Sequence, residues 1–106
     1  MEQPVTVRIF GTLIACREGT VDAWRDTAAF ARRALGKRFG NRVAVEYYAL
    51  FSPEMDRFPE VVALVAAGQG QVPLVFVEGE LLSSGGKVSV PDIRRRLEAI
   101  GLKPQL

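Results

Sequence analysis

Residues 72–77 read Val-Pro-Leu-Val-Phe-Val, and Glu78-Gly79 follows them directly. An apolar run of this length, rich in β-branched and aromatic residues, is typical of a strand that is buried on both faces. Glu78-Gly79 is a two-residue hairpin signal, because glycine readily adopts the positive φ that such turns require. We therefore expect residues 80–83 to return as the antiparallel partner strand. Proline at the head of a central strand is unusual, because it has no N–H to donate to the ladder.

Strand and helix patterns alternate through the rest of the chain. Val5, Val7 and Ile9 recur at every second residue, which predicts a strand that Gly11 ends. In chain order, the expected elements are a strand over residues 4–10, a loop over 12–19, a helix capped by Thr20 and running to about Arg38, a strand over 43–50, a helix from Pro59 to Gly68, strands over 72–77 and 80–83, and a helix from Ser89 or Val90 to Gly101. The order β-α-β-α-β-β-α predicts an α/β fold with a four-stranded mixed sheet covered by helices.

Length and composition favour one globular domain without a cofactor. The chain has 106 residues, which predicts a single domain over residues 1–106. The formal net charge is +2, and the arginine clusters at 32–33 and 94–96 are expected to be solvated helix faces, so no nucleic-acid partner is predicted. No leader pattern opens the chain and no apolar run approaches a membrane span, which predicts a cytoplasmic protein with no membrane partner. Histidine is absent, which removes the commonest metal ligand and general base, and no metal site is predicted.

Cys16 is the only cysteine, and it lies between the first strand pattern and the first helix pattern. It opens the sequence Cys16-Arg17-Glu18-Gly19. A single cysteine excludes an intramolecular disulfide. Arg17 and the amino end of the following helix favour the thiolate, whereas Glu18 opposes it, so we expect at most a modestly activated thiol.

The element order, Cys16 and Val72-Pro73 together resemble the thioredoxin-like superfamily. In that fold a cis proline precedes the third strand of the core and lies against the redox cysteines. The resemblance therefore implies a cis bond between Val72 and Pro73, although few X–Pro bonds in folded proteins are cis.

More narrowly, the chain resembles a small bacterial family of disulfide oxidoreductases, the YuzD-like group. The resemblance covers most of the chain and is carried by Phe10-Gly11, Cys16, the helix from Trp24 to Phe39, Gly40-Asn41, Ser52-Pro53 and Pro73-Leu74-Val75. That family pairs its first cysteine with another three residues on. Cys16 matches the first cysteine, and Gly19 occupies the place of the second. A weaker resemblance, in the spacing of Phe10 to Cys16 and of Val72 to Gly101, is to the arsenical-operon metallochaperone and repressor family, which binds arsenite through several cysteines.

These resemblances imply a degenerate relative of thiol–disulfide oxidoreductases, a monothiol enzyme with Cys16 as nucleophile. A dithiol enzyme releases its substrate when its second thiolate attacks the mixed disulfide, so Cys16 would need a low-molecular-weight or protein thiol as partner. The candidate binding residues are Arg17, Gly19, Val72 and Pro73. Pro73 would shape a groove, and the backbone of Val72 would pair with an extended substrate. The alternatives are a non-catalytic protein-binding module that keeps this groove and a soft-metal or arsenite-responsive protein. Cys16 is equally well explained as an inert residue that packs as a small hydrophobe.

Overall fold

A four-stranded mixed sheet forms the centre of the computed structural model, which describes residues 3–12, 14–16, 19–21 and 23–104. The strands lie in the order β4-β1-β5-β6, where β1 is Val5–Gly11, β4 is Val43–Ala49, β5 is Leu74–Val77 and β6 is Glu80–Ser84. β1 is parallel to β4 and antiparallel to β5, and β6 is antiparallel to β5. The predicted α/β fold with a four-stranded mixed sheet is therefore confirmed.

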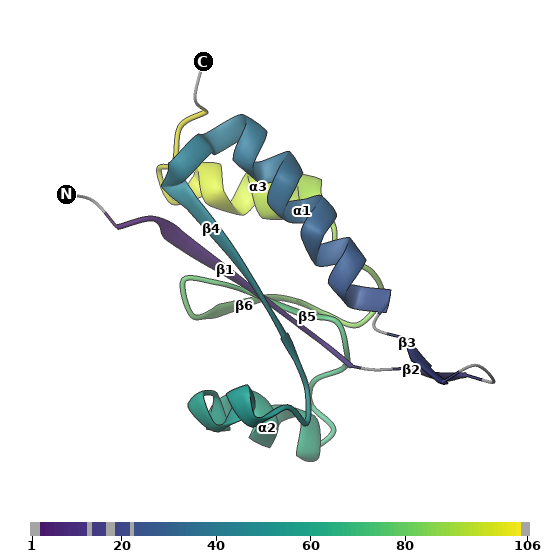
Figure 1. Cartoon of the computed structure of the whole chain (residues 1–106). Helices are drawn as coiled ribbons and strands as arrows, with labels where there is room; N and C mark the ends of the chain where they lie inside the picture. Colours follow the sequence, from purple (N-terminus) through teal and green to yellow (C-terminus); the bar gives the residue numbers. More distant parts are fainter. Residues whose placement is uncertain (1–2, 13, 17–18, 22, 105–106) are drawn as a thin grey trace.

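Helices cover both faces of this sheet (Figure 1). α1 (Ala23–Phe39) and α3 (Val90–Ala99) lie together on one face, and α2 (Pro59–Ala66) lies on the other. Two short 3₁₀ segments, η1 (Gly40–Arg42) and η2 (Pro53–Arg57), connect α1 to β4 and β4 to α2. Among the described residues, no helix combines the length and the apolar character needed to cross a membrane.

The two sides of the sheet bury different kinds of side chain. The side beneath α1 and α3 is mostly aliphatic and includes Ile9, Leu35, Val75 and Ile93. The side beneath α2 is rich in aromatic rings and includes Phe10, Tyr48, Phe58 and Phe76. This division follows from the pleat of the strands, because neighbouring residues such as Ile9 and Phe10 point to opposite faces. All four residues of β5 are buried, as the apolar run of residues 72–77 predicts.

The first strand-to-helix connection differs from the prediction. Residues 12–19 were expected to be a loop and Thr20 a helix cap. Instead, β2 (Ile14–Cys16) and β3 (Gly19–Val21) pair as an antiparallel hairpin, and α1 begins only at Ala23. The β-branched residues Ile14, Thr20 and Val21 favour extended backbone over helix, which explains why Thr20 joins a strand. Figure 1 shows the hairpin projecting beyond the end of the main sheet.

The later elements lie close to their predicted positions. β4 begins at Val43, as expected, and ends one residue early, at Ala49. α2 ends at Ala66, two residues short of the predicted end. The start of α3 is confirmed: the Oγ atom of Ser89, the N-cap, accepts a hydrogen bond from the N–H of Asp92 at 3.3 Å. Pro91 lies in the first turn, where its missing N–H costs nothing.

Gly11 is required by the close approach of Trp24, and its substitution tests this packing. A Cβ atom at Gly11 would lie 2.5 Å from the Cβ of Trp24, and that atom cannot move away by side-chain rotation. We expect Gly11→Ala to lower the free energy of unfolding by about 1–3 kcal/mol, measured by chemical denaturation. The control is Gly36→Ala in α1, which meets nothing within 4 Å. Because alanine is the better helix former, that variant should gain about 0.5–1 kcal/mol. Equal effects of the two substitutions would contradict this account of Gly11.

Candidate functional site

At one end of the main sheet, β1 and β4 finish and β5 begins. The parallel strands β1 and β4 both end there, since Gly11 pairs with Ala49, and the N–H of Leu50 donates to the carbonyl of Gly11 at 2.7 Å. β5 begins at the same edge, because Leu74 pairs with Phe10. In open α/β sheets, ligands bind outside the carboxyl ends of the strands. This edge is therefore the natural place for a functional site.

Cys16 lies at the end of β2, directly opposite Gly19 of β3. The two backbone positions of the Cys-x-x-Gly sequence are thus cross-strand neighbours. Arg17, another candidate binding residue, lies outside the described residues. α1 begins at residue 23, seven residues after Cys16, and the field of a helix end falls off within about one turn. The helix end therefore lies farther along the chain from Cys16 than the sequence predicted.

Val72 and Pro73 lie just before β5. The bond between them is cis, as the resemblance implied, and Pro73 is fully buried. The carbonyls of Gln71 and Pro73 both accept from the N–H of Gly85, at 2.8 and 3.0 Å. Among the described residues, no hydrogen bond engages the N–H or the carbonyl oxygen of half-buried Val72. Its backbone groups are the type that an added extended chain pairs with.

An apolar pocket of about 540 Å³ opens beside the end of β4, and the sequence did not predict it. Its walls come from the residues after β4, from η2 and from α2. The lining residues are Leu50, Phe51, Ser52, Pro53, Met55, Asp56, Val62, Val65 and Ala66. In the sequence, Ser52-Pro53 indicated only a break after the strand, because the pocket depends on how α2 packs against residues 50–57.

Phe51 at the rim of this pocket has an unusual backbone conformation. The N–H of Ser52 donates to the carbonyl of Ala49 at 3.2 Å, which closes a four-residue turn with Phe51 in its third position. Phe51 has a φ of 71°, and glycine or asparagine normally occupies such a position. Its side chain is 90% exposed, so the ring gains little from burial in the fold.

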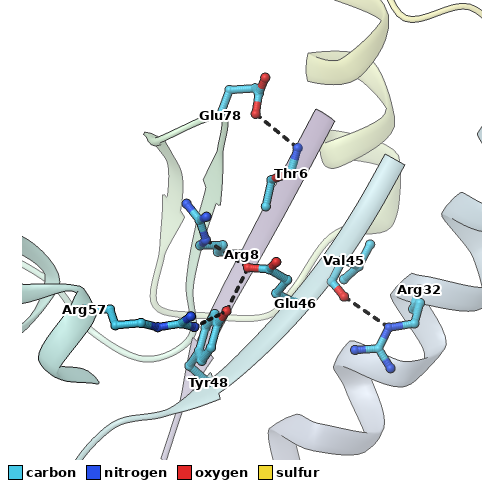
Figure 2. A network of polar contacts seen from close by, with 8 residues as sticks. All are labelled: Thr6, Arg8, Arg32, Val45, Glu46, Tyr48, Arg57 and Glu78. Atoms are coloured by element: carbon cyan, nitrogen blue, oxygen red, sulfur yellow. Dashed lines mark hydrogen bonds and ion pairs between the residues drawn. The ribbon is translucent and has the colours of Figure 1, made fainter. Parts of the chain in front are cut away.

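A polar network crosses the α2 face of the sheet (Figure 2). Arg8 Nε lies 3.0 Å from Glu46 Oε1, the hydroxyl of Tyr48 donates to the same oxygen at 2.8 Å, and Arg57 donates to the hydroxyl oxygen of Tyr48 at 2.7 Å. The guanidinium groups of Arg8 and Arg57 also lie over the ring of Phe58, 5.2 and 5.3 Å from its centroid.

The network shifts the pKa values of Glu46 and Tyr48. Burial raises the pKa of Glu46, but hydrogen bonds from Tyr48 and Arg8 and the charges of Arg8 and Arg57 outweigh burial, and the pKa lies below its usual value. Burial, together with the hydrogen bond to Glu46 and its charge, raises the pKa of Tyr48. Both shifts move the pKa values farther from pH 7, whereas a general acid or base works best with a pKa near the operating pH. The contacts of the network connect β1, β4 and η2.

Comparison with known proteins informs the fold alone. No family model matches the chain, and no curated protein matches it. Among solved structures, the crystal structure of the protein of unknown function SA0789 from Staphylococcus aureus is similar, with a TM-score of 0.69 and 15% sequence identity. The match covers 92% of this chain and 91% of that chain. At this identity, the likeness shows a shared α/β fold.

Within the described residues, no group of three or more His, Cys, Asp or Glu side chains is arranged to hold a metal ion.

The network makes stability dependent on pH in a defined window. Because the pKa of Glu46 is lower in the folded than in the unfolded chain, its contribution is complete above the usual glutamate value of about 4.3. It is lost as the pH falls through the lowered value. At pH 7 we expect Glu46→Gln to reduce the free energy of unfolding by about 0.5–1 kcal/mol, a modest effect because the pair is partly exposed. The loss should shrink below pH 4, as measured by urea denaturation. Glu54→Gln, which changes an exposed side chain in η2, is the control; if it matched Glu46→Gln, the network would not be the cause.

Because Phe51 has a positive φ, a residue that tolerates this conformation should stabilise the fold. Asparagine tolerates positive φ without the added backbone freedom of glycine. We expect Phe51→Asn to raise the free energy of unfolding by about 1 kcal/mol, measured by thermal or chemical denaturation. Phe30→Asn is the matched control, because Phe30 is also exposed but lies in α1 with ordinary helical geometry. That control should leave stability unchanged or lower it, and equal destabilisation of both variants would remove strain as the explanation.

Proposed function

We propose that the chain is a thioredoxin-like domain that forms mixed disulfides through Cys16 and binds extended polypeptide beside Pro73. The strand order β4-β1-β5-β6, with one parallel pair and two antiparallel pairs, supports this proposal. The cis bond to Pro73 agrees with the resemblance. The single observation that carries the function is the backbone of Val72, which has no hydrogen bond among the described residues and lies near the end of the sheet from which the Cys16 hairpin projects.

The proposed chemistry is a two-step thiol exchange with an external thiol. The Cys16 thiolate attacks one sulfur of a substrate disulfide, that S–S bond breaks, and the displaced substrate thiolate takes a proton from water. A low-molecular-weight thiol then attacks the sulfur of Cys16 and releases the second substrate thiolate. A second molecule of that thiol regenerates Cys16 and leaves as its own disulfide. Two external thiols are thus oxidised for each substrate disulfide that is reduced.

The second candidate, a protein-binding module without catalysis, is favoured by the position of Cys16. Cys16 belongs to a strand that ends seven residues before α1 along the chain, whereas activated thiols commonly stand at a helix N-terminus. In this case the groove at Val72 still binds an extended chain, and Cys16→Ser leaves binding unchanged. The two candidates therefore share a binding surface and differ only in the need for sulfur chemistry.

The hairpin register allows a gain-of-function test of the first candidate. Directly opposite residues of an antiparallel pair have Cα atoms about 4.5–5.5 Å apart, within the roughly 4.4–6.8 Å range of disulfides. We expect the wild-type protein to reduce insulin disulfides only when glutathione is present. Gly19→Cys should form an internal disulfide on oxidation, seen by mass spectrometry, and should cycle with a dithiol reductant at least about tenfold faster than wild type.

Thr20→Cys is the matched control, because it also adds a second cysteine to β3 but its backbone position pairs with Ala15 and not with Cys16. It should form no internal disulfide with Cys16. Wild-type protein that is inactive with and without glutathione, together with Cys16→Ser that still binds peptide, would reject the exchange reaction and select the binding module. An internal disulfide in Thr20→Cys but not in Gly19→Cys would contradict the register on which the test depends.

A further inference from the structure

The pocket beside β4 has the size and lining of a small-molecule site, and the proposed function uses none of its residues. Its volume of about 540 Å³ falls within the range of about 300–1,000 Å³ that is typical of ligand pockets. Seven of the nine lining residues are apolar, and they come from three consecutive segments, the turn after β4, η2 and α2. Leu50 and Met55 are buried and form fixed walls.

The conformation of Phe51 at the rim of the pocket lowers the stability of the free protein. Phe51 combines a φ of 71° with a ring that is 90% exposed, although glycine or asparagine would suit this turn better. Val62, across the pocket on α2, is also 45% exposed. Backbone outliers of this kind cluster at ligand clamps, where a bound molecule compensates for them. An apolar ligand would cover both side chains and remove their surface from water.

The charge of the lining selects the kind of ligand. Of the described residues that line the pocket, Asp56 is the only one with a formal charge, and the remaining polar residue is Ser52. A carboxylate at the mouth attracts a cation and repels an anion. The exposed ring of Phe51 adds to this preference, because the face of an aromatic ring attracts ammonium groups.

We propose that this pocket binds a small organic ammonium ion, whose apolar body lies between η2 and α2 and whose charged group lies near Asp56. The ligand class follows from three features together: an apolar cavity of suitable volume, an unburied aromatic ring at its rim and a single negative charge in its lining. The proposal is independent of Cys16 and of Val72.

Two probes that share a phenyl ring and differ in charge test the proposal directly. 2-Phenylethylammonium and 3-phenylpropionate are titrated into the full chain, and NMR follows the methyl signals of Leu50, Val62 and Val65. We expect saturable shifts with the ammonium probe. Its dissociation constant should be at least about threefold lower than that of the carboxylate probe, because a partly exposed ion pair contributes a free energy of about that size. Asp56→Asn should remove the difference between the probes.

Two tryptophan variants on α2 test the location of the site. Ala66 lines the pocket, so the indole of Ala66→Trp would fill it, and binding should weaken at least about tenfold. Ala63 is exposed on the same helix but does not line the pocket, so Ala63→Trp should bind the ammonium probe like wild type. Phe51→Asn should weaken binding about threefold while the protein stays folded, which distinguishes a ligand contact from a structural role.

Three results would overturn the proposal. The first is equal affinity for the two probes in the wild-type protein. The second is unchanged binding of the ammonium probe in Ala66→Trp. The third is a shift of the same methyl signals on dilution of the protein alone, which would mean that the pocket receives Phe51 of a second copy. Because Cys16→Ser should not affect probe binding, failure of this proposal is separable from failure of the thiol reaction.

Discussion

The antiparallel register that pairs Phe10 of β1 with Leu74 of β5 places the Val72-Pro73 segment next to the carboxyl end of β1. β1 is the only strand of the main sheet with a parallel neighbour on one side and an antiparallel neighbour on the other. Its carboxyl end therefore meets both the end of β4 and the start of β5. A shift of one residue in this register would turn the side chains of β1 to the wrong faces, exchanging Ile9 for Phe10 between the aliphatic and the aromatic side of the core. Burial on both faces thus fixes where Val72 and Pro73 lie.

The contrast between the two sides of the sheet accounts for the pocket. The aliphatic side is closed by two helices, of which α1 has 17 residues. The other side is covered by α2, with only eight residues, and by the short η2 segment. Aromatic rings fill most of the space: Phe10 stacks with Tyr48 at 5.7 Å and meets Phe58 and Phe76 edge-on. The cavity opens between the turn at Phe51, η2 and the short helix α2. The polar network of Arg8, Glu46, Tyr48 and Arg57 lies on a different part of the same side.

The sequence was most predictive where a local pattern and the tertiary environment favour the same structure. The apolar run of β5 is buried throughout, and the Ser89 cap and the Glu78-Gly79 turn lie where expected. The sequence did not predict the backbone conformation of this turn in full, because Glu78 also adopts a positive φ, of 50°. Two hydrogen bonds to Thr6 hold Glu78 in place: its N–H donates to the carbonyl of Thr6, and its carboxylate accepts from the N–H of Thr6. The hairpin over residues 14–21 was missed because strands of three residues are too short to produce a clear alternating pattern. The conformation of Phe51 depends on the pairing of Leu50 with Gly11, a contact that no local pattern contains.

The position of Cys16 separates two properties that usually occur together in a thiol–disulfide site. An added extended chain pairs with free backbone groups, and among the described residues the N–H and the carbonyl of Val72, next to buried Pro73, have no hydrogen bond, whatever the nature of residue 16. Thiol activation needs a positive field, and Cys16 pairs with Gly19 in the hairpin and precedes α1 by seven residues along the chain. The position of Val72 does not depend on the cysteine, because Pro73 and β5 belong to the core of the fold. The proposed binding position at Val72 is therefore shared by both proposed functions, and the chemistry of Cys16 decides only between them.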